Sequence, residues 1–169
     1  MREITLTRGY VALVDDCDFD RVSAHKWQAR VWFRADGSSR VSAQGMVRKS
    51  DGNRTMQQLH RLIMDAPAGM QVDHINSNPL DNRRVNLRLC TATENNHNMR
   101  PRTGGLSVYK GVHWHKGVRK WVAQIKCYDK RIYLGCFSSE LDAAKAYDAA
   151  AVEMFGEFAR MNTYQTKEV

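Results

Sequence analysis

The chain has 169 residues, with 26 Lys and Arg against 18 Asp and Glu and a formal net charge of +8. This length suits one compact domain or two small ones and excludes a large catalytic barrel. The hydrophobic fraction of 43% is typical of a globular chain. Because the sequence contains no bilayer-length apolar run and no recognisable secretory leader, we expect neither a membrane protein nor a secreted one.

The positive charge is concentrated in one block of the sequence. Residues 1–99 carry a net charge of +3, residues 100–135 carry +8, and residues 136–169 carry −3. The basic block also contains five aromatic residues: Tyr109, Trp114, Trp121, Tyr128 and Tyr133. Basic residues interleaved with aromatic ones are typical of nucleic-acid-binding surfaces. The alternative is a solvated basic sheet face, and we favour nucleic-acid binding over it.

The four cysteines are Cys17, Cys90, Cys127 and Cys136. None forms a CxxC pair or has zinc-finger spacing with histidine. Because Cys127 and Cys136 fall on predicted strands, we expect them to be buried thiols. The pattern predicts a reducing compartment, no disulfide and no zinc.

Residues 1–58 have the pattern of short strands separated by turns. The segments 10–14 and 26–33 are rich in β-branched and aromatic residues, and Asp36-Gly37 offers a hairpin turn between two strands. We expect the Trp27 and Trp32 side chains to lie in the core. His25 has no neighbours that suggest a site.

Residues 59–100 are rich in His, Asp and Asn. The segments 70–74 and 85–90 predict two strands, and Thr91 followed by Glu94 forms a capping box that predicts a helix start. The order strand, loop, strand, helix can bring Asp73, His74 and Asn95 together. Asn82, Arg83 and Arg84 are predicted to lie in a solvated loop with at most phosphate contacts.

These side chains fit the hydrolysis of a phosphodiester. That reaction needs a base for the attacking water and positive charge at the phosphate. The Asp73 carboxylate and the Asn95 amide oxygen suit a hard divalent cation, and His74 has a suitable pKa for a base near neutral pH. The alternative is ordinary turn chemistry, because Asn and Asp favour loops. The joint spacing of His74, Asn86 and the Thr91–Glu94 cap argues against that alternative.

The segment from "LHRLIM" through "VDHINSNPLDNRRVNLRLCTATENNHN" resembles the HNH nuclease family in its ββα-metal form. The resemblance implies that His74 is the general base and that Asp73 and Asn95 bind a divalent metal, with His97 as the substitute for Asn95. It implies that Asn86 pins the loop and positions the histidine. His60 and Arg61 resemble the HR pair that precedes the family core, and Arg61 is expected to hold a backbone phosphate.

The C-terminal part predicts three strands and a helix after a linker at 101–106. Strands at 121–127 and 131–136 alternate apolar and polar residues, with Ile132, Leu134 and Cys136 expected on one face. Ser139 with Asp142 predicts a helix start, and Gly156 predicts its end. An apolar stripe would pack this helix on the sheet: Leu141, Ala144, Tyr147, Ala151 and Met154.

This segment resembles the plant ethylene-response-factor (AP-two/ERF) DNA-binding domain through the pieces "YKGV", "WVAQI", "YLGCF" and "DAAKAYDAAA". In that family the sheet lies in the major groove. The residues carried over as DNA contacts are Lys110, His113, His115, Gln124, Lys126, Arg131 and Tyr133. Since several family positions are usually arginine or tryptophan, the base preference of the plant domains is not transferred. For His113 and His115, ordinary exposed sheet residues are an equal alternative.

The sequence therefore predicts an α+β protein. A ββα-metal nuclease core at 59–100 has a strand-rich N-terminal extension at 1–58. The linker joins it to a three-stranded antiparallel sheet with one helix at 107–163, and a tail follows at 164–169.

The predicted function is a site-specific HNH endonuclease of the phage or intron homing type that nicks double-stranded DNA as a monomer. The expected cofactor is Mg²⁺, with Mn²⁺ as the alternative. The expected location is the cytoplasm of a bacterial host. The alternatives are a DNA-binding regulator with an inactive nuclease fold and, resting on charge alone, an RNA-binding protein.

Overall fold

The computed structural model describes residues 1–33, 37–48, 52–99, 105–127 and 130–164, and the chain divides into two compact units, 1–95 and 96–169. It has the predicted mixed α+β class. The division falls within helix α3, before the predicted linker, of which residues 101–104 lie outside the described part. The described helices are all too short or too polar to cross a bilayer.

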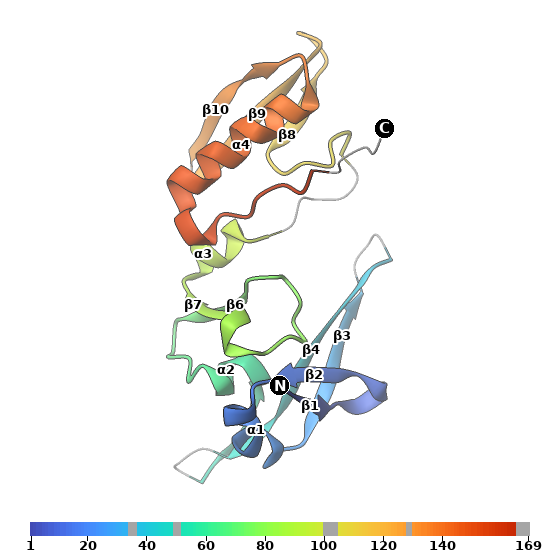
Figure 1. Cartoon of the computed structure of the whole chain (residues 1–169), viewed down its shortest axis with the longest axis vertical. Helices are drawn as coiled ribbons and strands as arrows, with labels where there is room; N and C mark the ends of the chain where they lie inside the picture. The colour runs from blue at the N-terminus through green and yellow to red at the C-terminus, as the bar shows by residue number, and fades with distance from the viewer. Residues whose placement is uncertain (34–36, 49–51, 100–104, 128–129, 165–169) are drawn as a thin grey trace. The chain divides into compact units, whose positions relative to one another are not determined.

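The described residues of the first unit form three small antiparallel sheets (Figure 1). They are the pair β1–β2, the three-stranded sheet β3–β4–β5 and the hairpin β6–β7. Its elements are β1 (Arg2–Thr5), the 3-10 turn η1 (Thr7–Gly9), β2 (Val11–Val14), α1 (Asp16–Ser23), β3 (Trp27–Phe33), β4 (Ser39–Arg48), β5 (Arg54–Gln58), α2 (Leu59–Ile63), β6 (Gln71–His74), the 3-10 turn η2 (Arg84–Asn86), β7 (Leu87–Cys90) and the start of α3 (Ala92–His97).

One hydrophobic core joins the N-terminal extension to the predicted nuclease segment. Val14 of β2 and Val22 of α1 are fully buried together with Leu59 and Ile63 of α2. Leu59, Leu62 and Ile63 have helical spacing, which turns all three toward this core. Burying one such side chain contributes about 1.5–3 kcal/mol. The extension therefore folds together with residues 59–95 as one unit.

Two local predictions in this unit are corrected. The strand pattern expected for residues 1–58 missed α1, where Asp16 and Asp18 in the first turn suit the helix dipole and Val22 reaches the core. The second strand of the hairpin begins at Leu87 rather than at residue 85, because Arg84–Asn86 form a 3-10 turn. The capping box is confirmed, since Thr91 Oγ1 accepts from Glu94 N at 3.2 Å and Glu94 Oε2 accepts from Thr91 N at 2.7 Å.

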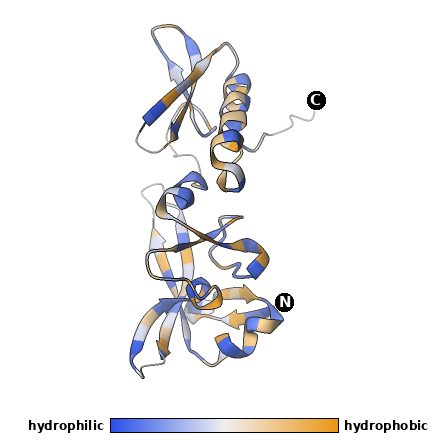
Figure 2. Cartoon of the chain, turned by 90° about the vertical axis from the view of Figure 1, so that its left-hand side faces the viewer, coloured by the Kyte–Doolittle hydropathy of each residue, from blue (hydrophilic) through white to orange (hydrophobic). Residues whose placement is uncertain are grey.

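The second unit is an antiparallel sheet in the order β10–β9–β8, covered on one face by a helix (Figure 1). Figure 2 shows hydrophilic and hydrophobic residues alternating along its strands. Its elements are β8 (Val112–His115), β9 (Lys120–Cys127), β10 (Lys130–Phe137), α4 (Glu140–Phe155) and the 3-10 turn η3 (Gly156–Phe158).

Helix α4 begins and ends where the sequence predicts. The Ser139 side chain accepts a hydrogen bond from Asp142 N, and Gly156 ends the helix with a φ of +52°. Ala144, Tyr147 and Ala151 are buried against the sheet, whereas the two ends of the predicted stripe, Leu141 and Met154, remain 38% and 37% exposed.

A β-bulge corrects the predicted face of Cys136. The register passes from Tyr133 opposite Gln124 to Gly135 opposite Ala123, which leaves Leu134 as the extra residue. A single extra residue exchanges the faces of the side chains that follow it. Cys136 therefore lies on the face that carries Tyr133, and it is exposed. All four cysteines are free, with Cys90 buried, Cys127 half-buried and Cys17 exposed.

Candidate functional site

Asp73 and His74 stand at the end of β6, where the chain leaves the hairpin for a long loop. In the β6–β7 register Asp73 lies opposite Arg88 and His74 opposite Leu87. Both residues are buried, with exposed fractions of 5% for Asp73 and 4% for His74. Because successive strand residues point to opposite faces, their neighbours differ. Asp73 pairs with Arg88, whereas the His74 ring contacts the loop and α2.

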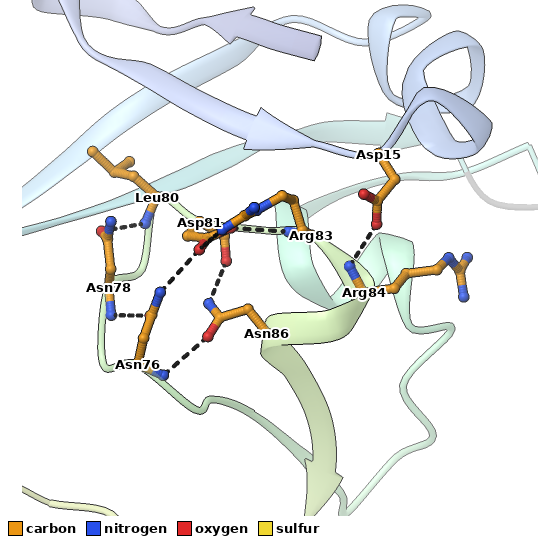
Figure 3. A network of polar contacts seen from close by, with 8 residues as sticks. All are labelled: Asp15, Asn76, Asn78, Leu80, Asp81, Arg83, Arg84 and Asn86. Carbon is orange, nitrogen blue, oxygen red and sulfur yellow. Dashed lines mark hydrogen bonds and ion pairs between the residues drawn. The ribbon is translucent and has the colours of Figure 1, made fainter. Parts of the chain in front are cut away.

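The loop at 75–86 is folded by its own polar side chains (Figure 3). Asn86 Nδ2 donates to the Asp81 carbonyl at 2.7 Å, and Asn86 Oδ1 accepts from Asn76 N at 2.9 Å. The Asp81 carboxylate accepts from Asn76 Nδ2 at 2.9 Å and from Arg83 Nε at 2.7 Å. These bonds lower the pKa of Asp81, the one from Arg83 most strongly. Asn86 thus ties both ends of the loop next to His74.

The N-terminal extension holds this loop from outside. Leu13 in β2 donates from its N to the Leu80 carbonyl at 2.8 Å and accepts from Asn82 N at 2.8 Å. The Arg84 backbone N donates to Asp15 Oδ2 at 2.7 Å (Figure 3), and its guanidinium pairs with Asp18 at 2.7 Å. The expectation of a solvated loop at 82–84 is wrong for Asn82, which has no exposed surface. The Arg83 and Arg84 side chains remain 36% and 48% exposed, and both form ion pairs.

A cavity of about 520 Å³ lies beside these residues. Its lining contains His60, Asp73, His74 and Asn95. The His60 and His74 rings meet edge to face with centroids 4.9 Å apart. Burial lowers the pKa of His60 to about 3, and the charge of His74 adds to that shift. Burial also lowers the pKa of His74, although its hydrogen bond with Asn82 opposes the shift. Both rings are therefore neutral at neutral pH.

The donor set of the cavity fits a hard divalent cation. Asp73 contributes a carboxylate, and Asn95 contributes an amide whose Nδ2 donates to Gln71 Oε1 at 2.6 Å, so its oxygen is the atom suited to a cation. Within the described ranges, His, Cys, Asp and Glu form no cluster of three or more that could hold a metal. A cation here would therefore have few protein ligands, as is usual for magnesium.

Arg61 and His97 do not have the surroundings expected of a phosphate contact and of a substitute metal ligand. Arg61 lines the cavity, but its guanidinium donates to the carbonyls of Met70 at 2.6 Å and of Ala66 and Pro67 at 3.1 Å, so it holds the turn before β6. His97 is not among the described residues that line the cavity. It belongs to the second unit, where its ring stacks on Phe155 with centroids 3.6 Å apart.

A basic sheet face forms another wall of the cavity, which the sequence analysis missed. Trp32, Arg40 and Ser42 line it, and Trp32 lies directly opposite Arg40 in the β3–β4 register. The Arg30 guanidinium stacks over the Trp32 ring at 4.8 Å. The expected core position is confirmed for Trp27, which is 5% exposed, but Trp32 is only half-buried. Basic and aromatic residues at alternate positions of the sequence from 30 to 34 were the signal.

The open face of the second sheet carries six of the seven predicted DNA contacts. The register aligns Gln124 with Tyr133 and Lys126 with Arg131, while His113 lies opposite Val122 and His115 opposite Lys120. These residues alternate with the ones that α4 covers.

Lys110 is not on this face. Its Nζ donates to the His97 carbonyl, and burial, followed by the charge of Arg160, lowers its pKa to about 8. Tyr128 lies outside the described residues.

Comparisons with known proteins agree with this two-part organisation. Residues 58–97 match a family model described as HNH endonuclease. The protein named "Uncharacterized HNH endonuclease L560" of Acanthamoeba polyphaga mimivirus is 33% identical over 116 residues, which cover 62% of this chain and 57% of the relative. Protein 3.8 of Escherichia phage T7 is 35% identical over 65 residues, covering 38% of this chain and 54% of the relative.

Plant transcription factors match as well. Dehydration-responsive element-binding protein 2C of Arabidopsis thaliana is 45% identical over 60 residues, which cover 34% of this chain but 17% of the plant protein. The chain thus spans about half of its viral relatives and a small part of the plant ones. The predicted resemblance to an HNH endonuclease that carries an ethylene-response-factor-like domain is confirmed.

Proposed function

We propose that the chain is a site-specific DNA endonuclease of the phage or intron homing type, which hydrolyses one strand of double-stranded DNA and depends on a divalent cation. The observation that carries this proposal is the convergence of Asp73, His74 and Asn95 on one cavity inside the segment that matches the HNH family. One such cavity makes one cut, so the expected product of a monomer is a nick.

His74 is the general base of the proposed reaction. Its buried imidazole has a lowered pKa and is neutral at neutral pH, so it can accept a proton from the attacking water. Asp73 and Asn95 would hold the cation, with Mg²⁺ as the expected ion and Mn²⁺ as the alternative. A divalent cation supplies positive charge at the scissile phosphate and at the leaving oxygen. Asn86 keeps the loop beside the base in place.

Both units present basic faces that suit DNA. In the second unit, Lys126 lies directly opposite Arg131, and in the first unit Arg48 lies directly opposite Arg54. Like charges opposite each other destabilise a sheet, and an anionic partner removes that repulsion. The phosphate backbone is such a partner, and an antiparallel ribbon fits the major groove. We propose that the open face of β8–β10 selects the site and that the Trp32–Arg40 wall holds the duplex near the cut.

The second candidate is a DNA-binding regulator with an inactive nuclease fold. The ethylene-response-factor-like segment favours it, since the plant relatives are transcription factors by name. The complete set of Asp73, His74, Asn86 and Asn95 argues for activity.

A cleavage assay on a selected site separates the two candidates. A bound sequence is first selected from random duplexes in the presence of EDTA and is then placed in a supercoiled plasmid. We expect open-circle DNA with Mg²⁺ and none with EDTA. His74→Ala should bind and not cut, whereas the matched variant His25→Ala should cut like the parent. Binding without cutting in Mg²⁺ and in Mn²⁺ would establish the regulator. Equal cutting by His74→Ala and the parent would remove His74 as the base.

A further inference from the structure

The Nε2 atom of the His74 ring lies beside a buried asparagine side chain. His74 Nε2 lies 3.3 Å from Asn82 Oδ1, and Asn82 has no exposed surface. The other amide atom of this asparagine, Nδ2, donates to the Pro79 carbonyl at 3.3 Å. Because the amide nitrogen is turned toward Pro79, the oxygen faces the imidazole. An oxygen acceptor requires a proton on Nε2, so the neutral ring has its lone pair on Nδ1.

Asn82 is itself held by a strand far away in the sequence. Its backbone N donates to the Leu13 carbonyl at 2.8 Å, and Leu13 forms a parallel bridge with Asp81. Leu13 lies in β2, outside the residues 58–97 that match the HNH family. The N-terminal extension therefore contributes to the placement of a side chain that contacts the proposed base.

We propose that Asn82 is a positioning residue that holds His74 in the Nε2–H tautomer, so that Nδ1 is the atom that takes the proton from water. The step is balanced: water gives one proton to Nδ1 while its oxygen forms the new bond to phosphorus. The bond from phosphorus to the leaving oxygen breaks, and that oxygen keeps the electron pair and takes a proton from solvent. The inference rests on the proposed nuclease function. Loss of an orienting partner of this kind typically costs about 10- to 100-fold in activity.

Three variants separate positioning from simple support of the fold. Asn82→Leu removes the acceptor at similar volume, Asn82→Asp keeps an oxygen toward the ring, and Asn78→Ala is the matched control in the same loop, since the Asn78 side chain accepts from the Leu80 backbone rather than contacting His74. We expect Asn82→Leu to lower the cleavage rate at saturating DNA about 10- to 100-fold with unchanged DNA affinity. Asn82→Asp should recover most of the rate, and Asn78→Ala should keep the parent rate.

The tautomer is also measured directly. In full-length protein labelled with ¹⁵N in the histidine rings, at about pH 8 where the ring is neutral, we expect Nε2 of His74 to be the protonated nitrogen. A protonated Nδ1 in the parent would overturn the inference, and so would a parent-like cleavage rate in folded Asn82→Leu. If Asn82→Leu fails to fold, the parent spectrum still tests the tautomer of His74, and the cleavage rate of Asn82→Asp still tests the positioning role of Asn82. If the parent cuts no DNA, the proposed function fails, while the spectrum tests the tautomer independently.

Discussion

The Asp73 carboxylate is bound twice through one oxygen by its cross-strand neighbour Arg88. Asp73 Oδ2 accepts from Arg88 Nε at 3.0 Å and from Nη2 at 2.7 Å, and the two side chains are 6% and 11% exposed. A nearly buried carboxylate requires such a partner, because an isolated buried charge is costly. A divalent cation held by Asp73 would share this carboxylate with the guanidinium. Arg88 and the proposed metal would therefore compete for the same negative charge.

Replacing Arg88 should lower stability and increase the response to metal. We expect Arg88→Gln to lose about 3 kcal/mol of unfolding free energy, since one partner of a buried pair is removed. Because Mg²⁺ then no longer competes with the Arg88 guanidinium for the Asp73 carboxylate, its addition should raise the melting temperature of Arg88→Gln more than that of the parent. Thermal unfolding with Mg²⁺ and with EDTA measures both effects.

A matched control exists at the Arg21–Asp65 pair. This pair is exposed, with side-chain exposed fractions of 42% and 69%, so Arg21→Gln should change stability by less than about 1 kcal/mol. Its Mg²⁺ response should equal that of the parent. An Arg88→Gln variant that responds to Mg²⁺ no more than Arg21→Gln would contradict the competition.

His60 should make the protein sensitive to acid. Its pKa is about 3 in the folded protein, whereas the ordinary histidine value of 6.5 applies to the unfolded chain. Between these values the unfolded chain binds a proton that the folded protein does not bind, so stability falls as the pH is lowered through this window. One such group changes the unfolding free energy by about 1.4 kcal/mol per pH unit. Denaturant unfolding of the parent and of His60→Gln from pH 7 down to pH 4 should give a shallower dependence for the variant. Parallel curves would show that His60 is not the group that titrates.

The sequence was a good guide where a local pattern decides the structure. The β6–β7 hairpin, the Thr91–Glu94 cap and helix α4 follow from alternation, capping and helical spacing. It failed where distant contacts decide. Asn82 is bound by Leu13 of β2, nearly 70 residues earlier in the chain. No pattern in the sequence next to Asn82 predicts this contact. The bulge at Leu134 moves Cys136 to the other face, and strict alternation cannot anticipate a bulge.

For the same reason, only one side of the cavity could be predicted from the sequence. Asp73, His74 and Asn95 lie on neighbouring elements of one short segment, so the order of these elements in the sequence was enough to predict that they meet in one site. The wall made by Trp32 and Arg40 comes from the β3–β4–β5 sheet, which shares the hydrophobic core with this segment. A sheet face can be assigned from alternation, but its partner in the fold cannot.

Gly111 should be indispensable to the second unit. It has a φ of +78°, and a Cβ added there would lie 1.9 Å from Tyr147 Cδ2. Gly9 has a closely similar φ of +75° and no atom within 4 Å of an added Cβ, which makes it the matched control. We expect Gly9→Ala to cost about 1–2 kcal/mol from the backbone alone. Gly111→Ala should cost about 2 kcal/mol more, because the clash adds to the same backbone strain. Equal thermal destabilisation by the two variants would show that Tyr147 moves aside without cost.

Lys126 should raise the affinity of the protein for DNA. It lies opposite Arg131 on the open face of the sheet, and Lys126→Ala removes one of these two positive charges. If Lys126 contacts a phosphate, the same variant should weaken DNA binding and reduce the slope of log affinity against log salt by about 1. Lys145→Ala removes the same charge from the exposed side of α4 and should change neither quantity. Titrations of a labelled duplex at several salt concentrations measure the affinity and its salt dependence. Thermal unfolding checks that both variants are folded. A slope for Lys126→Ala equal to that of Lys145→Ala would exclude Lys126 as a phosphate contact.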